Sequence, residues 1–285
     1  MAKLLLENAL DSLSLNGIEE SGTGVQATTG LTGMGLPPVA VQWLEGAGDG
    51  AVYRRTRVIP RDIDIPLDIV AGTPAQLRLL ISRLAKLFAG KCTLRFIEDD
   101  GTEWRTDVVR TGGFDIVYGT DTSGHKDLQT VVTVRSPDPY WTSAKSSIST
   151  ITAAAPAASF VSSFGTMPVS PSQAIGSMTL ENTGDATAYP VWTVFGPGDH
   201  FTAISPSGET LSWTGTLTSG QKLTIDTRYG TVVDDSGANR YANLAAAPRF
   251  WSLPPGTTTC TASLLNTTTS SKIVCSWQAR KWMVI

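Results

Sequence analysis

Large apolar residues recur at intervals of three and four in the segment TPAQLRLLISRLAKLFAG, residues 73–90. This spacing places them on one face of an α-helix. Each contributes about 1.5–3 kcal/mol when fully buried, so the segment predicts an amphipathic helix packed on a sheet. The residues of the apolar face are Leu77, Leu80, Ile81, Leu84, Leu87 and Phe88.

Start and stop signals flank this helix. Thr73 is a suitable N-cap, Pro74 occupies the tolerated first position, and Gln76 completes a capping-box pattern. Gly90 supplies a left-handed C-terminal stop. We therefore expect the helix to begin after Thr73 and to end before Gly90.

Runs typical of β-strands surround the helix and are separated by Gly- and Asp-rich turns. Together with the helix they predict one α+β domain over residues 1–142. The runs are VYRRTRVIP (52–60), DIDIPLDIV (62–70), CTLRFIED (92–99), TEWRTDVVR (102–110), GFDIVYG (113–119) and LQTVVTVRS (128–136).

One run carries an acidic stripe, because Asp62, Asp64 and Asp68 alternate with Ile and Leu and therefore share one face of a strand. Pro66 lacks a backbone donor, which predicts an edge strand. The basic cluster Arg54, Arg55 and Arg57 precedes the stripe, and cross-strand pairing of these arginines with the aspartates is expected. Alternating strand carboxylates without a Gly-containing loop usually form a solvated face, so no metal site is expected.

The second half of the chain has a different pattern. Residues 143–173 are poor in charge and rich in small residues, which indicates a connecting segment. Residues 174–285 show short alternating runs with turn signals roughly every 8–12 residues, which predict a β-sandwich. The fold class expected for the whole chain is therefore mainly β.

The last two runs, residues 257–265 and 270–278, predict a terminal hairpin. Such a hairpin would place Cys260 and Cys275 nearly opposite each other, either as a disulfide or as two half-buried thiols. The three cysteines, with Cys92, lack metal-ligand spacing.

Composition narrows the function. The 285 residues include only 16% charged residues, and the formal net charge of -3 provides no basic footprint for nucleic acid. The start MAKLLLENAL is too short in apolar residues for a signal peptide, and no stretch approaches a membrane span. We expect a chain made in a reducing cytoplasm.

Little in the sequence suggests catalysis. The tetrapeptides DTSG (121–124) and DDSG (234–237) faintly resemble aspartic protease loops, but they fit polar turns better. His125 and His200 fall in predicted loops, too few for a triad or a multi-histidine metal site. The Gly-rich segment 22–38 matches no phosphate-binding motif and is interpreted as a flexible loop. No enzyme activity and no cofactor are expected.

Tryptophans are numerous in and just before the second half, which raises the possibility of sugar stacking. Tryptophan within the strands of a sandwich usually packs between the sheets, so a core role is favoured. The residues are Trp141, Trp192, Trp213, Trp251, Trp277 and Trp282.

Several segments together resemble the siphophage distal tail protein family, also called the siphovirus tail component family, along nearly the whole chain. The order and spacing of the segments carry the resemblance. They are RDIDIPLDI (61–69) followed by the Pro-started helix, SPDPYW (136–141), NTGDATAYPVW (182–192), LTIDTRYGTV (223–232) and FWSLPPG (250–256).

The resemblance implies a structural protein of the virion, at the distal end of a phage tail. The N-terminal domains would form a homo-hexameric ring around a channel, and galectin-like C-terminal domains would project outward. Tail tube protein, a tail-associated hub protein and receptor-binding proteins would be the partners. Asp62, Asp64 and Asp68, with the arginine cluster 54–57, would then face the channel or a subunit boundary.

Other classes remain open from the sequence. A carbohydrate-binding adhesion module would expose two or three Trp or Tyr side chains on one concave face. A tail-associated hydrolase would need carboxylates, or a nucleophile with its base, converging in a cleft. A different tail-ring component would share a helix packed on a sheet.

Overall fold

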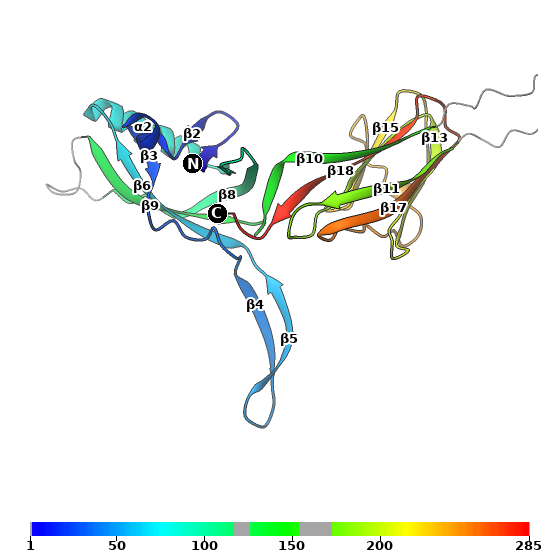
Figure 1. Cartoon of the computed structure of the whole chain (residues 1–285), viewed down its shortest axis with the longest axis horizontal. Coiled ribbons are helices and arrows are strands. Elements are labelled where there is room, and N and C mark those ends of the chain that lie inside the picture. Colours follow the sequence, from blue (N-terminus) through cyan, green and yellow to red (C-terminus); the bar gives the residue numbers. More distant parts are fainter. Residues whose placement is uncertain (1, 117–125, 154–172, 285) are drawn as a thin grey trace, which may run out of the picture. The chain divides into compact units, whose positions relative to one another are not determined.

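The computed structural model describes residues 2–116, 126–153 and 173–284 (Figure 1). The chain divides into two compact units, unit 1 (Met1–Ala144 with Lys281–Ile285) and unit 2 (Lys145–Arg280). Antiparallel strands dominate both units, so the predicted mainly β class is confirmed. Within the described residues, no helix is both long and apolar enough to cross a membrane.

Unit 1 contains a large antiparallel sheet with α2 (Pro74–Leu87) packed on it (Figure 1). The start of β10 (Trp141–Thr152) also pairs with β8, and a short helix α1 (Gly17–Ser21) precedes β3. The strand order is β2 (Ser12–Ser14), β1 (Lys3–Glu7), β7 (Lys91–Ile97), β8 (Glu103–Gly113), β9 (Asp127–Ser136), β6 (Arg61–Val70) and β3 (Gly24–Ala27).

Helix α2 begins as its sequence predicts. The Thr73 side chain accepts a hydrogen bond from the backbone N–H of Gln76 (3.2 Å), and Pro74 is the first helical residue. The helix ends at Leu87, before Gly90 as expected, but the predicted left-handed stop is wrong, because Phe88 is a right-handed cap and Gly90 has no positive φ. The buried apolar side chains are Leu77, Leu84, Leu87 and Phe88, while Leu80 and Ile81 are half-buried.

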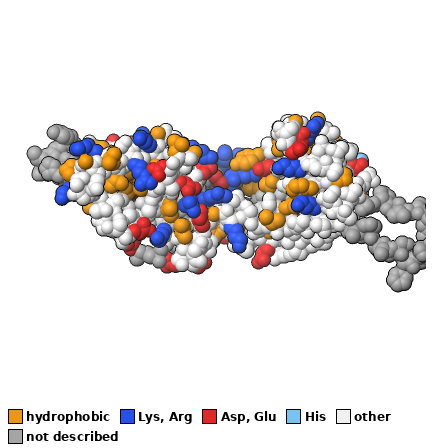
Figure 2. Space-filling view, turned by 90° about the horizontal axis from the view of Figure 1, so that it is seen from above, with side chains coloured by type: hydrophobic (Ala, Val, Ile, Leu, Met, Phe, Trp, Pro, Cys, Tyr) orange, Lys and Arg blue, Asp and Glu red, His pale blue; other side chains and the backbone are white. Residues whose placement is uncertain are grey.

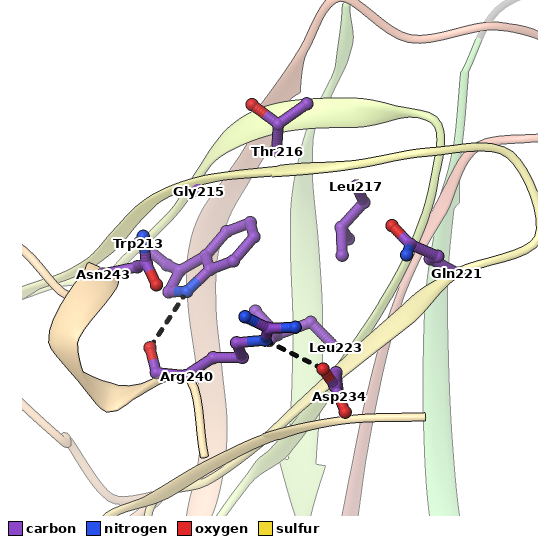
Figure 3. Close-up of a pocket in the computed structure, with 9 residues that line it drawn as sticks. All are labelled: Trp213, Gly215, Thr216, Leu217, Gln221, Leu223, Asp234, Arg240 and Asn243. Atoms are coloured by element: carbon purple, nitrogen blue, oxygen red, sulfur yellow. Dashed lines mark hydrogen bonds and ion pairs between the residues drawn. The ribbon is translucent and has the colours of Figure 1, made fainter. Parts of the chain in front are cut away.

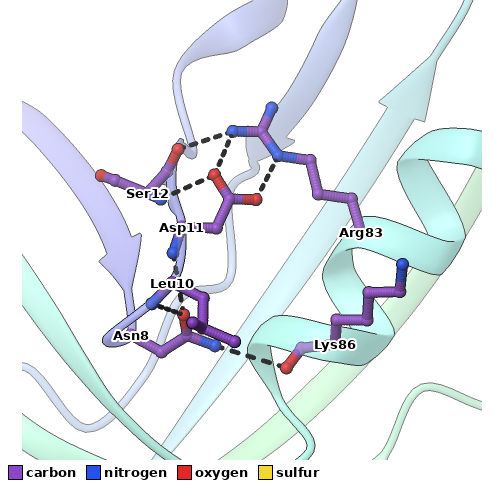
Figure 4. A network of polar contacts seen from close by, with 6 residues as sticks. All are labelled: Asn8, Leu10, Asp11, Ser12, Arg83 and Lys86. Carbon is purple, nitrogen blue, oxygen red and sulfur yellow. Dashed lines mark hydrogen bonds and ion pairs between the residues drawn. The ribbon is translucent and has the colours of Figure 1, made fainter.

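A polar latch fixes the end of α2 to the β1–β2 turn (Figure 4). The Arg83 guanidinium donates two hydrogen bonds to the Asp11 carboxylate (2.6 and 2.7 Å) and a third to the carbonyl of Ser12. The Asn8 side chain accepts from two N–H groups of the turn and donates to the carbonyl of Lys86. The Arg83 hydrogen bond lowers the pKa of Asp11, so the latch carries charge at neutral pH.

Strand β6 lies between β9 and β3, so the predicted edge position is wrong. The carbonyl of Pro66 accepts from the N–H of Thr28 (2.9 Å), beyond the last β3 pair of Ala27 with Leu67. In an antiparallel strand the nitrogen and the carbonyl of one residue face the same side. Pro66 therefore turns its missing donor away from β9 and leaves that ladder intact.

The Gly-rich segment 22–38 packs along β6 and is not the flexible loop expected. It forms β3 and then continues beside β6, where the N–H of Thr32 donates to the carbonyl of Asp64 (3.1 Å). Gly33 has φ +85°, and a Cβ there would lie 2.2 Å from the carbonyl oxygen of Asp62. Glycine is therefore required for this close backbone approach.

Two strands stand apart from the sheet of unit 1. β4 (Val39–Glu45) and β5 (Ala51–Val58) pair only with each other among the described strands, as a hairpin that extends away from the sheet (Figure 1). The run predicted at 113–119 is not a strand where it is described, because β8 ends at Gly113 and residues 114–116 are irregular. Residues 117–119, the tetrapeptide 121–124 and His125 lie outside the described residues.

Unit 2 is a sandwich of two antiparallel sheets. Trp192 is central to its core and contacts Trp251 (5.6 Å between ring centroids) and Phe201 (5.7 Å). One sheet has the order β16 (Thr231–Asp234), β15 (Lys222–Asp226), β12 (Val191–Phe195), β18 (Lys272–Lys281) and β10; the other has β11 (Ala174–Asn182), β17 (Gly256–Leu265), β13 (Gly198–Ile204) and β14 (Thr210–Leu217).

The predicted terminal hairpin is wrong, because β17 and β18 belong to different sheets of the sandwich. Cys260 and Cys275 lie on these two strands as buried free thiols, as does Cys92 in unit 1. Residues 143–152, assigned to the connecting segment from the sequence, form most of β10, and residues 154–172 lie outside the described part. His200 is in β13 at a bulge, not in a loop.

Candidate assembly surface

The acidic stripe lies on one face of β6, as its alternation predicts. Asp62 accepts two hydrogen bonds from the Arg135 guanidinium on β9 (2.6 and 2.7 Å), which lowers the pKa of Asp62. Asp64 accepts from the Thr133 hydroxyl of the same strand (2.7 Å). Asp68 forms no ion pair with another described residue. The stripe is therefore part of a polar sheet surface that β9 completes.

The predicted pairing of the stripe with Arg54, Arg55 and Arg57 is wrong. These arginines lie on β5, which pairs with β4 and not with β6. The Arg55 guanidinium instead donates to the side-chain oxygen of Gln42 (2.7 Å). The arginines and the aspartates are close in the sequence, but the strands that carry them, β5 and β6, do not pair with each other.

A β-bulge determines which side chains of β4 and β5 share each face of the hairpin. Gln42 lies opposite Arg55 and Trp43 lies opposite Tyr53, so Arg54 is the extra residue. Because neighbouring residues of β4 point to opposite faces, Gln42 and Arg55 share one face, while Trp43 and Tyr53 share the other.

The aromatic face of the hairpin is apolar and open to solvent. The rings of Trp43 and Tyr53 meet edge to face at 5.8 Å, and the Tyr53 hydroxyl lies 2.9 Å from the Thr56 hydroxyl. Trp43 is 58% exposed, and Val39 and Val41 are also exposed. Residues of this kind, Tyr, Trp and Arg, dominate the energetics of protein interfaces. Sequence reasoning missed β4, although VAVQWLE followed by GAGDG and AVY carried the signal of alternation around a Gly-rich turn.

Arg61, at the start of β6, is an internal anchor. It is 1% exposed and donates to four carbonyls from three segments: Gly33 (3.0 Å) and Met34 (3.2 Å), Pro139, and Trp282. Burial lowers the pKa of Arg61. The first residue of the motif RDIDIPLDI thus ties the Gly-rich segment, the SPDPYW segment and the C-terminal residues of unit 1 together.

The segments of unit 2 that carry the family resemblance organise loops. Asn182 is buried, donates to the carbonyls of Ala186 (2.9 Å) and Leu253 (3.1 Å), and accepts from the N–H of Gly184. Asp226 accepts from the N–H groups of Arg228 and Tyr229 in the turn that joins β15 to β16. These polar side chains satisfy backbone groups, and they do not converge on a reaction centre.

The tryptophans confirm the expected core role. Five of the six are buried: Trp141, Trp192, Trp213, Trp251 and Trp277. Trp213 lines a small cavity of about 170 Å³ with Asp234 and Arg240 (Figure 3), but the indole itself is buried and donates to the carbonyl of Arg240 (3.3 Å). None of these five rings presents an open face for sugar stacking.

In the described part of the chain, the side chains that could take part in catalysis or bind a metal are already hydrogen-bonded or do not form a cluster. Asp234, from the DDSG turn, accepts from the hydroxyl and N–H of Ser236, from the N–H of Ala238 and from the Arg240 guanidinium, which together lower its pKa to about 2. No group of three His, Cys, Asp or Glu side chains suited to a metal ion is found among residues 2–116, 126–153 and 173–284. On the face shown in Figure 2, acidic and basic side chains are interspersed.

A comparison with known protein families indicates the class of protein to which this chain is similar. Residues 183–280 match the family model described as the siphovirus-type tail component, C-terminal domain. A search of curated proteins gave no match. The resemblance to the siphovirus tail component family that the sequence predicts is therefore confirmed.

Solved structures extend the likeness to the whole chain. The SPP1 Dit protein (gp 19.1), described as a paradigm of the hub adsorption apparatus in phages that infect Gram-positive bacteria, matches with a TM-score of 0.68 at 14% identity, over 98% of this chain and 99% of that one. Chains of the phage P2 baseplate in its activated conformation, with Ca and with Sr, match with a TM-score of 0.52 at 9% identity, over 97% of this chain and 98% of theirs. Both units therefore share the fold of SPP1 Dit.

Proposed function

We propose that this chain is a distal tail protein: a structural component of the virion that forms a hexameric ring at the tip of a long, non-contractile phage tail. In this function the ring joins the tail tube protein to a tail-associated hub protein and holds receptor-binding proteins. The observation that carries the proposal is the SPP1 Dit fold over 98% of the chain. The tail component match of residues 183–280 also supports it.

Unit 1 supplies the surfaces that a ring needs in this proposal. A cyclic ring is built from head-to-tail contacts, so each copy requires two different complementary surfaces. The β4–β5 hairpin is one such surface, since its aromatic face has no partner among the described residues. An isolated two-stranded hairpin is marginally stable in water, and burial against another copy would stabilise it.

The acidic stripe is assigned to the channel or to the subunit boundary. Asp62, paired with Arg135, belongs to the polar sheet surface and suits a channel wall to which passing DNA does not adhere. Asp68, without an ion pair to another described residue, suits the boundary. A ring structure with these carboxylates on its outer surface would contradict both assignments.

Unit 2 is proposed to dock neighbouring tail proteins, including receptor-binding proteins, and not a sugar. The buried tryptophans support this choice over a carbohydrate-binding module. A glycan array probed with the purified chain tests it. Retention of a specific glycan, abolished by substitution of an exposed aromatic such as Tyr229, would favour the carbohydrate-binding function instead.

The ring itself is tested by native mass spectrometry and negative-stain microscopy of the purified chain. The expected result is a mass six times that of the 30.2 kDa chain and six-fold symmetric particles. A chain that stays monomeric at the concentrations of both measurements would overturn the ring.

A further inference from the structure

The outer strands of the sandwich of unit 2 differ in how their free backbone edges are covered. The edge of β14 is covered by the chain itself, since the carbonyl of Ser212 accepts from the N–H of Ala245 (2.9 Å). The edge of β16 is covered in the same way, since the carbonyl of Val232 accepts from the N–H of Arg240 (2.8 Å). Cover of this kind prevents an edge strand from pairing with another chain.

The register of the four-stranded sheet shows which backbone groups of β11 face its free edge. The carbonyl of Thr210 in β14 accepts from the N–H of Arg249 (3.2 Å), so the backbone of Thr210 points away from β13. Opposite residues of an antiparallel pair point their backbone groups either toward each other or both away. Thr210 lies opposite Ile204 of β13, and Ile204 lies opposite Thr261 of β17. Thr261 lies opposite Ser177, so the backbone of Ser177 points away from β17.

Three residues of β11 therefore turn their N–H and C=O groups toward the free edge: Ile175, Ser177 and Thr179. Among residues 2–116, 126–153 and 173–284, no other segment forms a backbone hydrogen bond with these groups. The next residue in the series, Glu181, accepts from the indole N–H of Trp277 (3.0 Å), which ends the open stretch. The open stretch of β11 is thus a row of main-chain donors and acceptors without a strand beside it.

β11 also lacks the features that usually protect an edge strand. Its nine pairs with β17 run from Ala174 to Asn182 without a bulge. It contains neither Lys nor Pro, and Ile175 is 60% exposed within the open stretch. Natural sheets block the addition of a strand with lysines, prolines and bulges at their edges. The edge of β11 is therefore suited to accept a strand.

We propose that the free edge of β11 pairs with an extended segment of another tail protein, which adds a strand to the four-stranded sheet. This inference rests on the proposed function and names the way in which unit 2 docks its partner. In this mode of recognition, main-chain hydrogen bonds provide the affinity, and side chains at alternate positions provide the specificity.

The composition of the sheet face defines the chemistry of the added segment. Glu181, at the end of the open stretch, is the only charged residue of β11 and β17. A charged segment would therefore find no opposite charge along the open stretch. Hydroxyl and β-branched side chains pair favourably across strands, and β17, with the sequence GTTTCTASLL, already pairs with β11 in this way. The segment is accordingly uncharged, with Ser, Thr, Val or Ile at alternate positions.

Hydrogen exchange resolved to single amides tests the added strand. The measurement compares the purified chain with the same chain in intact virions. In the purified chain, the outward N–H groups of Ser177 and Thr179 should exchange rapidly, and the N–H of Met178, which points toward β17, should exchange slowly. In virions all three should exchange slowly, because the added strand bonds the outward groups. Protection gained at alternate residues is specific to strand addition.

Two variants at one position separate backbone pairing from side-chain contact. Ser177→Pro removes the outward N–H and leaves the hydrogen bonds of β11 to β17, as Pro66 leaves the ladder of β6 with β9. Ser177→Ala is the matched control, because it keeps the N–H and removes only the hydroxyl. Virions with Ser177→Pro should show rapid exchange at Thr179, whereas virions with Ser177→Ala should match the wild type. The wild-type comparison stands by itself if the proline variant does not fold.

The contrary outcomes are distinct. Rapid exchange at Ser177 and Thr179 in virions that contain the chain would overturn the added strand and leave the proposed function intact. Slow exchange of the same amides in the purified chain would overturn it too, since the chain itself, or a second copy if dilution restores rapid exchange, would then cover the edge. Absence of the chain from purified virions would overturn the proposed function and the inference with it.

Discussion

Replacement of Arg61 by methionine should destabilise unit 1 strongly. The guanidinium is buried and donates to carbonyls of Gly33, Met34, Pro139 and Trp282. Methionine fills a similar volume and donates nothing, so four carbonyls of three separate segments lose their donor. Arg61→Lys keeps the charge but lacks the planar fork that reaches all three segments.

The magnitude follows from the type of contact. A hydrogen bond to a charged group contributes about 1.5–3 kcal/mol, but the four bonds do not add, because burial of the guanidinium opposes them, as the lowered pKa of Arg61 indicates. A buried acceptor that loses its donor costs about 1–3 kcal/mol, and here carbonyls of three segments lose theirs. We therefore expect Arg61→Met to lose about 3–5 kcal/mol and Arg61→Lys to lose less.

Urea denaturation combined with hydrogen exchange measures this effect. The two units can unfold in separate steps, so exchange at segments 33–34, 139–140 and 281–284 assigns the loss to unit 1. The control is Arg135→Met, which removes an exposed ion pair with Asp62 and should leave the midpoint nearly unchanged. If Arg61→Met unfolds within about 1 kcal/mol of the wild type, Arg61 is not the anchor described.

Three further outcomes follow from the structure. Gly33→Ala should lower the free energy of unfolding by more than about 1–2 kcal/mol, measured in urea, because it combines a positive φ with a clash at the backbone; an unchanged midpoint would show that the Gly-rich segment is not packed on β6. Asp234→Asn should destabilise unit 2 at pH 6, and the difference in unfolding free energy from wild type should shrink as the pH falls from 3.8, the ordinary pKa of Asp, toward about 2, the pKa of Asp234. The lowered pKa stabilises the fold above the pKa of the unfolded chain, and this stabilisation is lost when Asp234 is protonated, so a difference independent of pH would refute the role of the charge. Cys92 and Cys260, whose pKa values burial raises to about 11, should not react with a thiol reagent at pH 8 until urea is added, and rapid labelling of the native chain would contradict their burial.

The sequence by itself determined the local elements with strong periodicity. The start of α2 was predictable because its cap and first-turn residues act within four positions of one another. The alternation in β6 was predictable because side chains on a strand point to opposite faces whatever the neighbouring strand is. The burial of the tryptophans followed from the same alternation and from the size of the ring.

Strand pairing was decided only in the tertiary structure. The two final strands are adjacent in sequence and read as a hairpin, yet β17 pairs with β11 and β13 in one sheet, and β18 pairs with β12 and β10 in the other. The arginine cluster and the acidic stripe also seemed to be partners. Because β4 pairs with β5, Arg55 donates its hydrogen bond to Gln42, and Asp62 accepts from Arg135.

The assembly surface shows the same division. Sequence pattern and resemblance identified residues 54–57 and the stripe 62–68 as interface candidates, and these remain proposals. The exposure of Trp43 could not be read from the sequence, since an apolar residue at strand spacing is normally buried. Local chemistry thus set the elements and their faces, while long-range packing set which faces were buried within the chain and which were left for a partner.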